Sequence, residues 1–250
     1  ALIACPDGRV VATTDFMIEG RHFRRSWSEP YDIGRKAAAR NLADVAAMGG
    51  RATALLVALA APAELELAWA LAFADGLREE CQLVGASVVG GDTSSADSIV
   101  VAVTALGDLE GRAPVTRSGA QVGDVVAVCG RLGWAAAGLA VLGRGFRAPR
   151  VVVEAHRRPQ PPYDAGPEAA LLGAHAMVDV SDGLVADLGH VARASSVRID
   201  LDRDAFELAQ PLLDVGAAVG ADPLSFVLTG GDDHALAACF PVDVELPEHW

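Results

Sequence analysis

Residues 31–61 read YDIGRKAAARNLADVAAMGGRATALLVALAA and pass from a helical to a strand pattern. The Ala-rich segment 31–48 predicts a helix, and the pair Gly49-Gly50 is typical of a helix end. The apolar run 52–61 predicts a buried strand. Asp44 interrupts the apolar side of the helix, where a carboxylate is costly unless it has a partner. Asp44 is therefore the first candidate functional residue.

Outward from this helix and strand, apolar segments alternate with glycine- and proline-rich ones. The patterns predict strands at 10–14, 86–89, 98–106, 124–129, 176–180, 197–201, 225–229 and 234–240. They predict further helices at 62–83, 134–142, 168–175, 183–195 and 207–219, and an irregular Pro-rich stretch at 157–167. Segment 107–122 is rich in Gly, Arg and Ser and is the best candidate boundary. We expect two α+β domains, residues 1–115 and 116–250.

The bulk composition excludes several classes of protein. A formal charge of −13 argues against a protein that binds nucleic acid through its phosphates. No apolar run reaches the roughly 18 residues that span a bilayer, and no signal segment follows Ala1. The four cysteines are scattered without a C-x-x-C pair, which argues against a zinc ribbon and favours a reducing compartment. We therefore expect a cytoplasmic protein with no membrane or nucleic-acid partner.

Basic residues are unevenly distributed by type. Lys36 is the only lysine in the chain. A site that handles phosphates here would rely on arginine, backbone amides or metal ions.

Carboxylates recur where predicted elements end. Asp15 follows the first strand, and Asp92 follows two glycines between strands. Asp179 and Asp182 bracket a strand-to-helix junction, and Asp232 and Asp233 follow Gly230-Gly231 after the strand predicted at 225–229. Carboxylates beside glycines suit a hard cation such as Mg²⁺. Any one of them is more often a cap, and Asp182 is placed to cap the helix at 183, but their repetition favours a metal site.

Five segments resemble the motifs of thiamine-monophosphate kinases, in the same order along the chain. Segment 13–23, TTDFMIEGRHF, resembles the family's T-D-x-x-x-E-G-x-H-F. Segment 41–49, NLADVAAMG, resembles N-x-S-D-x-A-A-M-G with Ala43 in place of Ser. Segments 90–93, GGDT, 179–184, DVSDGL, and 229–233, TGGDD, match later blocks. The similarity extends over essentially the whole chain.

The resemblance implies transfer of the γ-phosphoryl group of ATP to thiamine monophosphate, giving thiamine diphosphate and ADP. It implies an α+β fold like that of the aminoimidazole-ribonucleotide-synthetase superfamily, with an N-terminal sheet domain that pairs in a homodimer and a C-terminal α/β layer domain. The residues implied to hold several Mg²⁺ ions are Thr13, Thr14, Asp15, Asp44, Asp92, Asp179 and Asp182. Those implied to contact ATP are Gly91, Asp92, Arg117 and Ser181, and those implied to contact the substrate are His22 and Asp232. No protein nucleophile is expected, because phosphoryl transfer depends on positioning and charge neutralisation.

The sequence departs from the family pattern at three places. The segment 231–234, GDDH, stands where the family has G-E-D-Y, so a shorter carboxylate and a histidine replace the usual pair. The family's metal-binding Gly-Asp-Asp loop would precede Ala1, and its aromatic substrate contact would follow Trp250. We therefore expect the polypeptide to extend upstream, with a loop that becomes ordered when Mg²⁺ and nucleotide bind.

Two alternatives remain open from the sequence. One is another ATP-dependent enzyme of the same superfamily, of the aminoimidazole-ribonucleotide, selenophosphate or hydrogenase-maturation type. The motif GGDT at 90–93 argues against the first and last, which carry G-G-E-T, and no Cys lies beside an N-terminal glycine-rich loop as selenophosphate synthesis favours. The other is a catalytically silent nucleotide-binding protein, which the intact aspartates argue against.

Overall fold

Helix α1, Pro30–Ala47, is the central element of the computed structural model, which describes residues 2–250. Pro30 occupies the first turn, where its missing N–H costs nothing, and the backbone N–H of Glu29 donates to Asp32. Most of the helix is buried, because it packs on a sheet, on a second helix and on the C-terminal half of the chain. Few surface helices are covered on so many sides.

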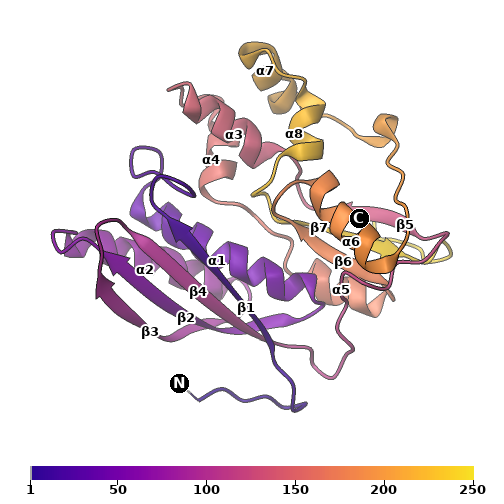
Figure 1. Cartoon of the computed structure of the whole chain (residues 1–250), viewed down its shortest axis with the longest axis horizontal. Helices are drawn as coiled ribbons and strands as arrows, with labels where there is room; N and C mark the ends of the chain where they lie inside the picture. The colour runs from indigo at the N-terminus through magenta and orange to yellow at the C-terminus, as the bar shows by residue number, and fades with distance from the viewer. Residues whose placement is uncertain (1) are drawn as a thin grey trace.

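The N-terminal half is a four-stranded sheet covered on one face by two helices (Figure 1). Its elements are β1 Val11–Ile18, β2 Arg51–Ala61, α2 Leu67–Gln82, β3 Ser87–Ser95 and β4 Val100–Asp108. The strand order is β1-β4-β2-β3, with β2 and β3 parallel and the other pairs antiparallel. Alternate residues of β4 are buried, as expected for a sheet with one covered and one open face.

Helices α1 and α2 touch backbone to backbone. A Cβ atom added to Gly34 would lie 2.1 Å from the carbonyl oxygen of Phe73, and one added to Gly76 would lie 2.1 Å from that of Tyr31. Only glycine fits at these two positions. The crossing therefore fixes where α1 lies along its own axis.

The C-terminal half builds a second, three-stranded sheet in the order β5-β7-β6, with both strand pairs antiparallel. Its strands are β5 Val125–Cys129, β6 Ala176–Val180 and β7 Ala235–Phe240. Its helices are α3 Trp134–Gly143, α4 Arg150–Arg157, α5 Ala165–Leu171, α6 Leu184–Ser195, α7 Gln210–Val219 and α8 Pro223–Thr229, with a 3-10 turn at Arg203–Ala205. Helix α1 contacts this half through α4, α5 and β6.

No single helix within residues 2–250 has the length and apolarity needed to cross a bilayer, although α7 and α8, which meet at a 111° bend, pass the test as a pair.

The α+β class and the approximate places of most elements are confirmed, and several details are wrong. Strand β1 continues through Asp15 to Ile18, so Asp15 lies within the strand and not after it. Residues 90–93 lie inside β3, not in a turn, because an edge strand tolerates residues of low strand propensity. Helix α2 begins at Leu67, not at Pro62.

The C-terminal predictions contain the larger errors. Segment 225–229 is helical, because Asp222 accepts the N–H of Leu224 and Pro223 opens the helix. Asp232 and Asp233 therefore follow a helix, not a strand. Segment 197–201 has no regular structure, helix α4 lies just before the stretch expected to be irregular, and the helix expected at 168–175 is α5.

Candidate active site

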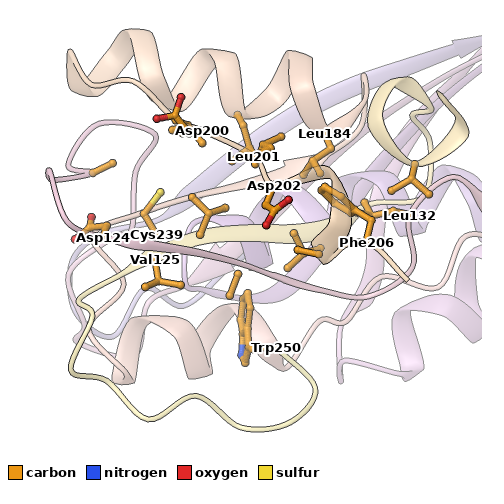
Figure 2. Close-up of a pocket in the computed structure, with 18 of the residues that line it drawn as sticks. Asp124, Val125, Leu132, Leu184, Asp200, Leu201, Asp202, Phe206, Cys239 and Trp250 are labelled. Carbon is orange, nitrogen blue, oxygen red and sulfur yellow. The ribbon is translucent and has the colours of Figure 1, made fainter. Parts of the chain in front are cut away.

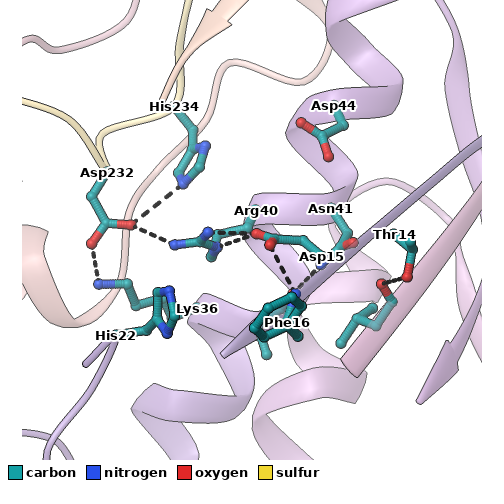
Figure 3. Close-up of polar contacts among 12 residues, drawn as sticks. Thr14, Asp15, Phe16, His22, Lys36, Arg40, Asn41, Asp44, Asp232 and His234 are labelled. Atoms are coloured by element: carbon teal, nitrogen blue, oxygen red, sulfur yellow. Dashed lines mark hydrogen bonds and ion pairs between the residues drawn. The ribbon is translucent and has the colours of Figure 1, made fainter. Parts of the chain in front are cut away.

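One stripe of α1 carries three ionisable side chains toward the C-terminal half. Lys36, Arg40 and Asp44 are spaced by four residues, so they lie one above the other on the same side of the helix. The ammonium group of Lys36 forms an ion pair with Asp232, and the Arg40 guanidinium binds both Asp15 and Asp232 (Figure 3). The stripe thus links β1 to the loop after α8.

Two loops of the C-terminal half meet this stripe, and glycines hold them together. The N–H of Asp232 donates to the carbonyl of Ser181 at 2.8 Å, and that of His234 donates to Val180 at 3.1 Å. A Cβ atom on Gly231 would lie 2.0 Å from the Ser181 carbonyl oxygen, so a larger residue is excluded there. This contact brings the predicted ATP-binding Ser181 beside the predicted substrate-binding Asp232.

Asp232 and His234 both adopt positive φ angles, 71° and 55°, which are uncommon for residues other than glycine. Burial opposes ionisation of Asp232, but Lys36, His234 and Arg40 outweigh it and hold the pKa of this carboxyl well below its usual range. The loop therefore presents a carboxylate that is ionised and fixed by cations on two sides.

Asp44 and Asp179 form the acidic centre of the site. The Thr13 hydroxyl donates to Asp44 Oδ2 at 2.7 Å. Burial, followed by the nearby charge of Asp179, raises the pKa of Asp44 to about 6. Asp179 is buried and hydrogen-bonded to His234 Nδ1 at 3.0 Å.

His234 is the protonated partner of this centre. Burial alone lowers the pKa of an imidazole, but the hydrogen bond to Asp179 and the nearby charge of Asp232 outweigh burial and raise the pKa of His234 to about 9. At neutral pH its positive charge balances part of the carboxylate cluster.

His22 lies close to the same network, within reach of the charges of Arg40 and Asp15. Its Nδ1 accepts the backbone N–H of Ile18 at 3.0 Å, which leaves the protonated ring nitrogen as Nε2. Burial and then the charge of Arg40 lower the pKa of His22, so the ring is neutral at pH 7. A neutral imidazole at this place has an N–H that can donate to a ligand oxygen.

The predicted metal ligands do not all lie on one side of the N-terminal sheet. Side chains alternate between faces along a strand, so Thr13 and Asp15 face the helices and Thr14 faces away. Asp92 pairs with Ala58 on the open face, three strand spacings or about 14 Å from β1. Thr14 and Asp92 are therefore not brought together with Asp44 and Asp179 within one chain.

Gly91 lies beside Asp92 on edge strand β3. A Cβ atom there would meet the carbonyl oxygen of Val57 at 1.8 Å, so close pairing with β2 requires glycine at this position. The whole strand is exposed. Gly91 therefore shapes the edge that presents Asp92.

Ser181 and Asp182 lie at the start of α6, but Asp182 is not its cap. The structure places Gly183 at the cap position, and Asp187 accepts the N–H groups of Asp182 and Gly183 at 3.0 and 3.1 Å. Burial raises the pKa of Asp187. The exposed Asp182 carboxylate remains directed to solvent, which is compatible with a ligand.

Arg117 lies apart from these groups. Its carbonyl accepts the hydroxyl of Ser195 at 3.2 Å, at the end of α6 opposite Asp182. A 12-residue helix is about 18 Å long, so the two positions are well separated. The side chain is exposed, and no contact with Ser181 connects it to the site.

Sequence reasoning missed four residues of this network: Lys36, Arg40, Asp187 and His234. Their spacing offered a partial signal, because Lys36 and Arg40 precede Asp44 by eight and four residues on a helix. The partners of Asp187 and His234 are brought close only by the fold.

A cavity of about 1190 Å³ lies away from these residues (Figure 2). Its walls are formed by β5, by segment 197–207 and by C-terminal residues that include Cys239 and Trp250. None of the predicted site residues lines it. We therefore centre the site on the carboxylate network and not on this cavity.

The acidic centre offers oxygen donors of the kind that bind Mg²⁺. No group of three or more His, Cys, Asp and Glu side chains within residues 2–250 already has the geometry of a metal site. However, Asp44 and Asp179 are mutually repelling carboxylates beside a hydroxyl, and hard oxygen donors of this kind suit Mg²⁺. The residues therefore fit the ion.

Comparison with known proteins assigns the chain to a family. Residues 1–109 match the model of the AIR synthase related protein N-terminal domain, and residues 121–238 match that of the C-terminal domain. The thiamine-monophosphate kinase of Mycobacterium tuberculosis is 53% identical over 241 residues, which cover 96% of this chain and 72% of that protein. The chain belongs to the thiamine-monophosphate kinase family.

Other members of the thiamine-monophosphate kinase family support the assignment. The enzyme of Corynebacterium glutamicum is 40% identical over 93% of this chain and 72% of its own length. The structure of AaThiL complexed with AMPPCP and TMP has a TM-score of 0.91 at 33% identity, covering 98% of this chain and 79% of that one. Hydrogenase maturation protein HypE with ATP has a TM-score of 0.79 at 19% identity and shares the fold. The family is thus that of kinases rather than of the hydrogenase-maturation proteins.

Proposed function

We propose that this chain is a Mg²⁺-dependent kinase that transfers the γ-phosphoryl group of ATP to thiamine monophosphate, giving thiamine diphosphate and ADP. The observation that carries the proposal is 53% identity to a thiamine-monophosphate kinase over nearly the whole chain. The structure of a relative in complex with AMPPCP and TMP supports it. We place the reaction in the cytoplasm.

The site divides between donor and acceptor sides in this proposal. Mg²⁺ would be held by Thr13, Thr14, Asp15, Asp44, Asp92, Asp179 and Asp182, and when bound it neutralises phosphate charge. Gly91, Asp92, Arg117 and Ser181 contact ATP in the proposal, and His22 and Asp232 contact the thiamine phosphate.

The chain's own groups supply positioning and charge. The neutral His22 ring donates its Nε2–H to an oxygen of the acceptor phosphate. Protonated His234 holds the Asp179 carboxylate in place at 3.0 Å, and the Thr13 hydroxyl does the same for Asp44. Bound orientation of this kind is the main protein contribution to phosphoryl transfer.

A homodimer would join the two groups of residues that the sheet separates. The open face carries Thr14, Asp92 and apolar side chains such as Phe16, which is 54% exposed. A second copy covering this face would bury the apolar side chains and bring further ligands toward the site. We expect sedimentation of the protein at micromolar concentration to give a dimer mass; a monomer mass would contradict this part of the proposal.

The division into domains of residues 1–115 and 116–250 is part of the same proposal. Each half has its own sheet, the N-terminal family model ends at residue 109, and the C-terminal one begins at residue 121. These observations support a boundary in this region.

A coupled assay that follows ADP release tests the reaction. Full-length protein with ATP, thiamine monophosphate and Mg²⁺ should form thiamine diphosphate, identified by chromatography, and excess chelator should abolish the product. ATP turnover with selenide or a purine precursor but not with thiamine monophosphate would contradict the proposal. Nucleotide binding without turnover would indicate a silent protein instead.

A further inference from the structure

Arg40 connects the two sides of the proposed site. Its Nε donates to Asp15 Oδ2 at 2.7 Å, and its Nη1 donates to Asp232 Oδ1 at 3.2 Å (Figure 3). Asp15 is a proposed metal ligand, and Asp232 is a proposed acceptor contact. The guanidinium therefore spans the interval across which a phosphoryl group would pass.

The guanidinium retains donors that the fold does not use. Arginine has five N–H groups, and the contacts with Asp15 and Asp232 occupy one each on Nε, Nη1 and Nη2. One N–H on each terminal nitrogen has no hydrogen-bond partner within residues 2–250. The Arg40 side chain is 17% exposed, so a ligand can reach it. Each of these two N–H groups can donate to a phosphoryl oxygen.

Neighbouring cations have other contacts. Lys36 is 3% exposed, and its ammonium group is held by Asp232 and by the His156 carbonyl at 3.0 Å. Arg35 points to the other side of α1 and pairs with Glu80. Lys36 is thus a positioning residue for Asp232, and through it for Arg40. Arg40 is the cation best placed to meet a ligand between Asp15 and Asp232.

We propose that Arg40 contacts the phosphoryl group during its transfer and stabilises the charge on its oxygens, an inference that rests on the proposed kinase function. An oxygen of the acceptor phosphate supplies the electron pair of the new bond to the γ-phosphorus. The bond from the γ-phosphorus to the β,γ-bridging oxygen breaks, and ADP leaves with that electron pair. Charge lies on the three remaining oxygens throughout, and two of them accept the free N–H groups of Arg40. Asp15 and Asp232 hold the guanidinium in place.

The test compares Arg40→Met and Arg40→Lys with the exposed control Arg78→Met on α2. Turnover of ATP with thiamine monophosphate is measured beside calorimetric affinity for two Mg²⁺-loaded probes. AMPPCP mimics bound ATP, and ADP with tetrafluoroaluminate mimics a planar phosphoryl group in transfer. We expect Arg40→Met to lower kcat by about 100-fold or more and to weaken the tetrafluoroaluminate complex by at least about 10-fold. AMPPCP affinity should change by less than about 3-fold, and Arg78→Met should leave both affinities and kcat unchanged.

Two results for Arg40→Met would overturn the inference: a kcat within about 3-fold of wild type, or an equal loss of affinity for the two probes. A normal kcat in Arg40→Lys would also overturn it, because lysine keeps the charge but lacks the N–H groups of the guanidinium. Arg40→Lys also decides the matter if Arg40→Met fails to fold. Absence of thiamine monophosphate turnover in wild type would refute the proposed function. The comparison of the two probes would then still support or refute the phosphoryl contact by itself.

Discussion

Helix α1 carries two ionic networks on opposite sides, and they differ in how completely they are closed. On one side Glu80, 1% exposed, binds Arg35 and accepts the Tyr163 hydroxyl at 2.6 Å. On the other side the Arg40 network is partly open to solvent and contains more carboxylates than cations, and His234 Nε2 has no hydrogen-bond partner among residues 2–250. The difference teaches that a fully paired network stabilises the fold, whereas a network with surplus charge and free donors is suited to bind a ligand.

The closed network also joins the two halves of the chain. Tyr163 comes from the segment before α5, yet its ring packs against the core under the N-terminal sheet. Burial and the neighbouring Glu80 charge raise the pKa of Tyr163 well above its usual value, so the phenol stays a hydrogen-bond donor at any physiological pH. Predictions for the two networks therefore separate stability from catalysis.

The largest effect is expected at the acidic centre. Asp44→Asn and Asp179→Asn each remove a charge from the proposed metal site, and we expect turnover to fall by about 100-fold or more while the protein stays folded. Steady-state kinetics and circular dichroism measure the two properties. The exposed Asp200→Asn serves as control. Near-normal turnover in Asp44→Asn would make Asp44 structural.

Opening the closed network should affect stability instead. Glu80→Ala leaves Arg35 and Tyr163 without their buried partner, and we expect the free energy of unfolding to fall by about 3 kcal/mol. The exposed Glu64→Ala, in the segment before α2, should cost less than about 0.5 kcal/mol. Urea denaturation provides both numbers. If Glu80→Ala lost activity without losing stability, the Glu80 network would belong to the active site, and the distinction between a structural and a functional network would be wrong.

The pH dependence of stability sharpens the comparison further. The pKa of Asp44 is about 6 in the folded chain against an ordinary value of 3.8, so the folded state holds the proton more tightly than the unfolded state. Ionising Asp44 between pH 4 and 6 therefore costs stability. We measure the free energy of unfolding of wild type and of Asp44→Asn in the presence of chelator at both pH values. The stabilisation by the substitution should be about 1 to 2 kcal/mol larger at pH 7.5 than at pH 4. Equal effects at the two pH values would mean that the surroundings of Asp44 do not oppose its ionisation.

The smallest effect is expected for one hydrogen bond of the closed network. Tyr163→Phe keeps the packing of the ring and removes the 2.6 Å contact with Glu80. We expect a loss of about 1 kcal/mol in the free energy of unfolding and normal turnover. Hydrogen exchange of residues 158–165 provides a local measurement, since their protection should fall more than that of β2. Unaltered exchange there would show that the hydrogen bond does not tie the halves together.

The sequence allowed the acidic centre to be found but not its geometry. Asp44 was identifiable because a carboxylate amid alanines needs a partner, and Asp179 and Asp182 because they flank a sharp strand-to-helix change. The strand pattern at 10–14 stops before Asp15, so it does not predict that Thr14 and Asp15 point to opposite faces of the sheet. The position of Asp92 on the open face depends on strand order, which local patterns do not contain.

Other errors arose where two local signals disagreed. Segment 225–229 contains Phe, Val and Thr, which favour strands, but the Asp222-Pro223 pair begins a helix there. No local pattern singles out Arg40, because an arginine on an alanine-rich helix is usually a solvated side chain. Its role depends on two carboxylates 25 and 192 residues away, and only the fold brings these together.

The glycine contact between α1 and α2 has a consequence for how this chain tolerates change. Gly34 lies in the first half of α1, more than two turns before Asp44, and Gly76 on α2 meets the α1 backbone at Tyr31 and Arg35. A methyl group at either position would push the helices apart and slide Lys36, Arg40 and Asp44 together relative to the loops they meet. In a library of random substitutions, Gly34 and Gly76 would therefore score as active-site residues although they touch no ligand. A variant at either position would fold and keep its carboxylates, but it would lose turnover because α1 no longer lies in register with the loops.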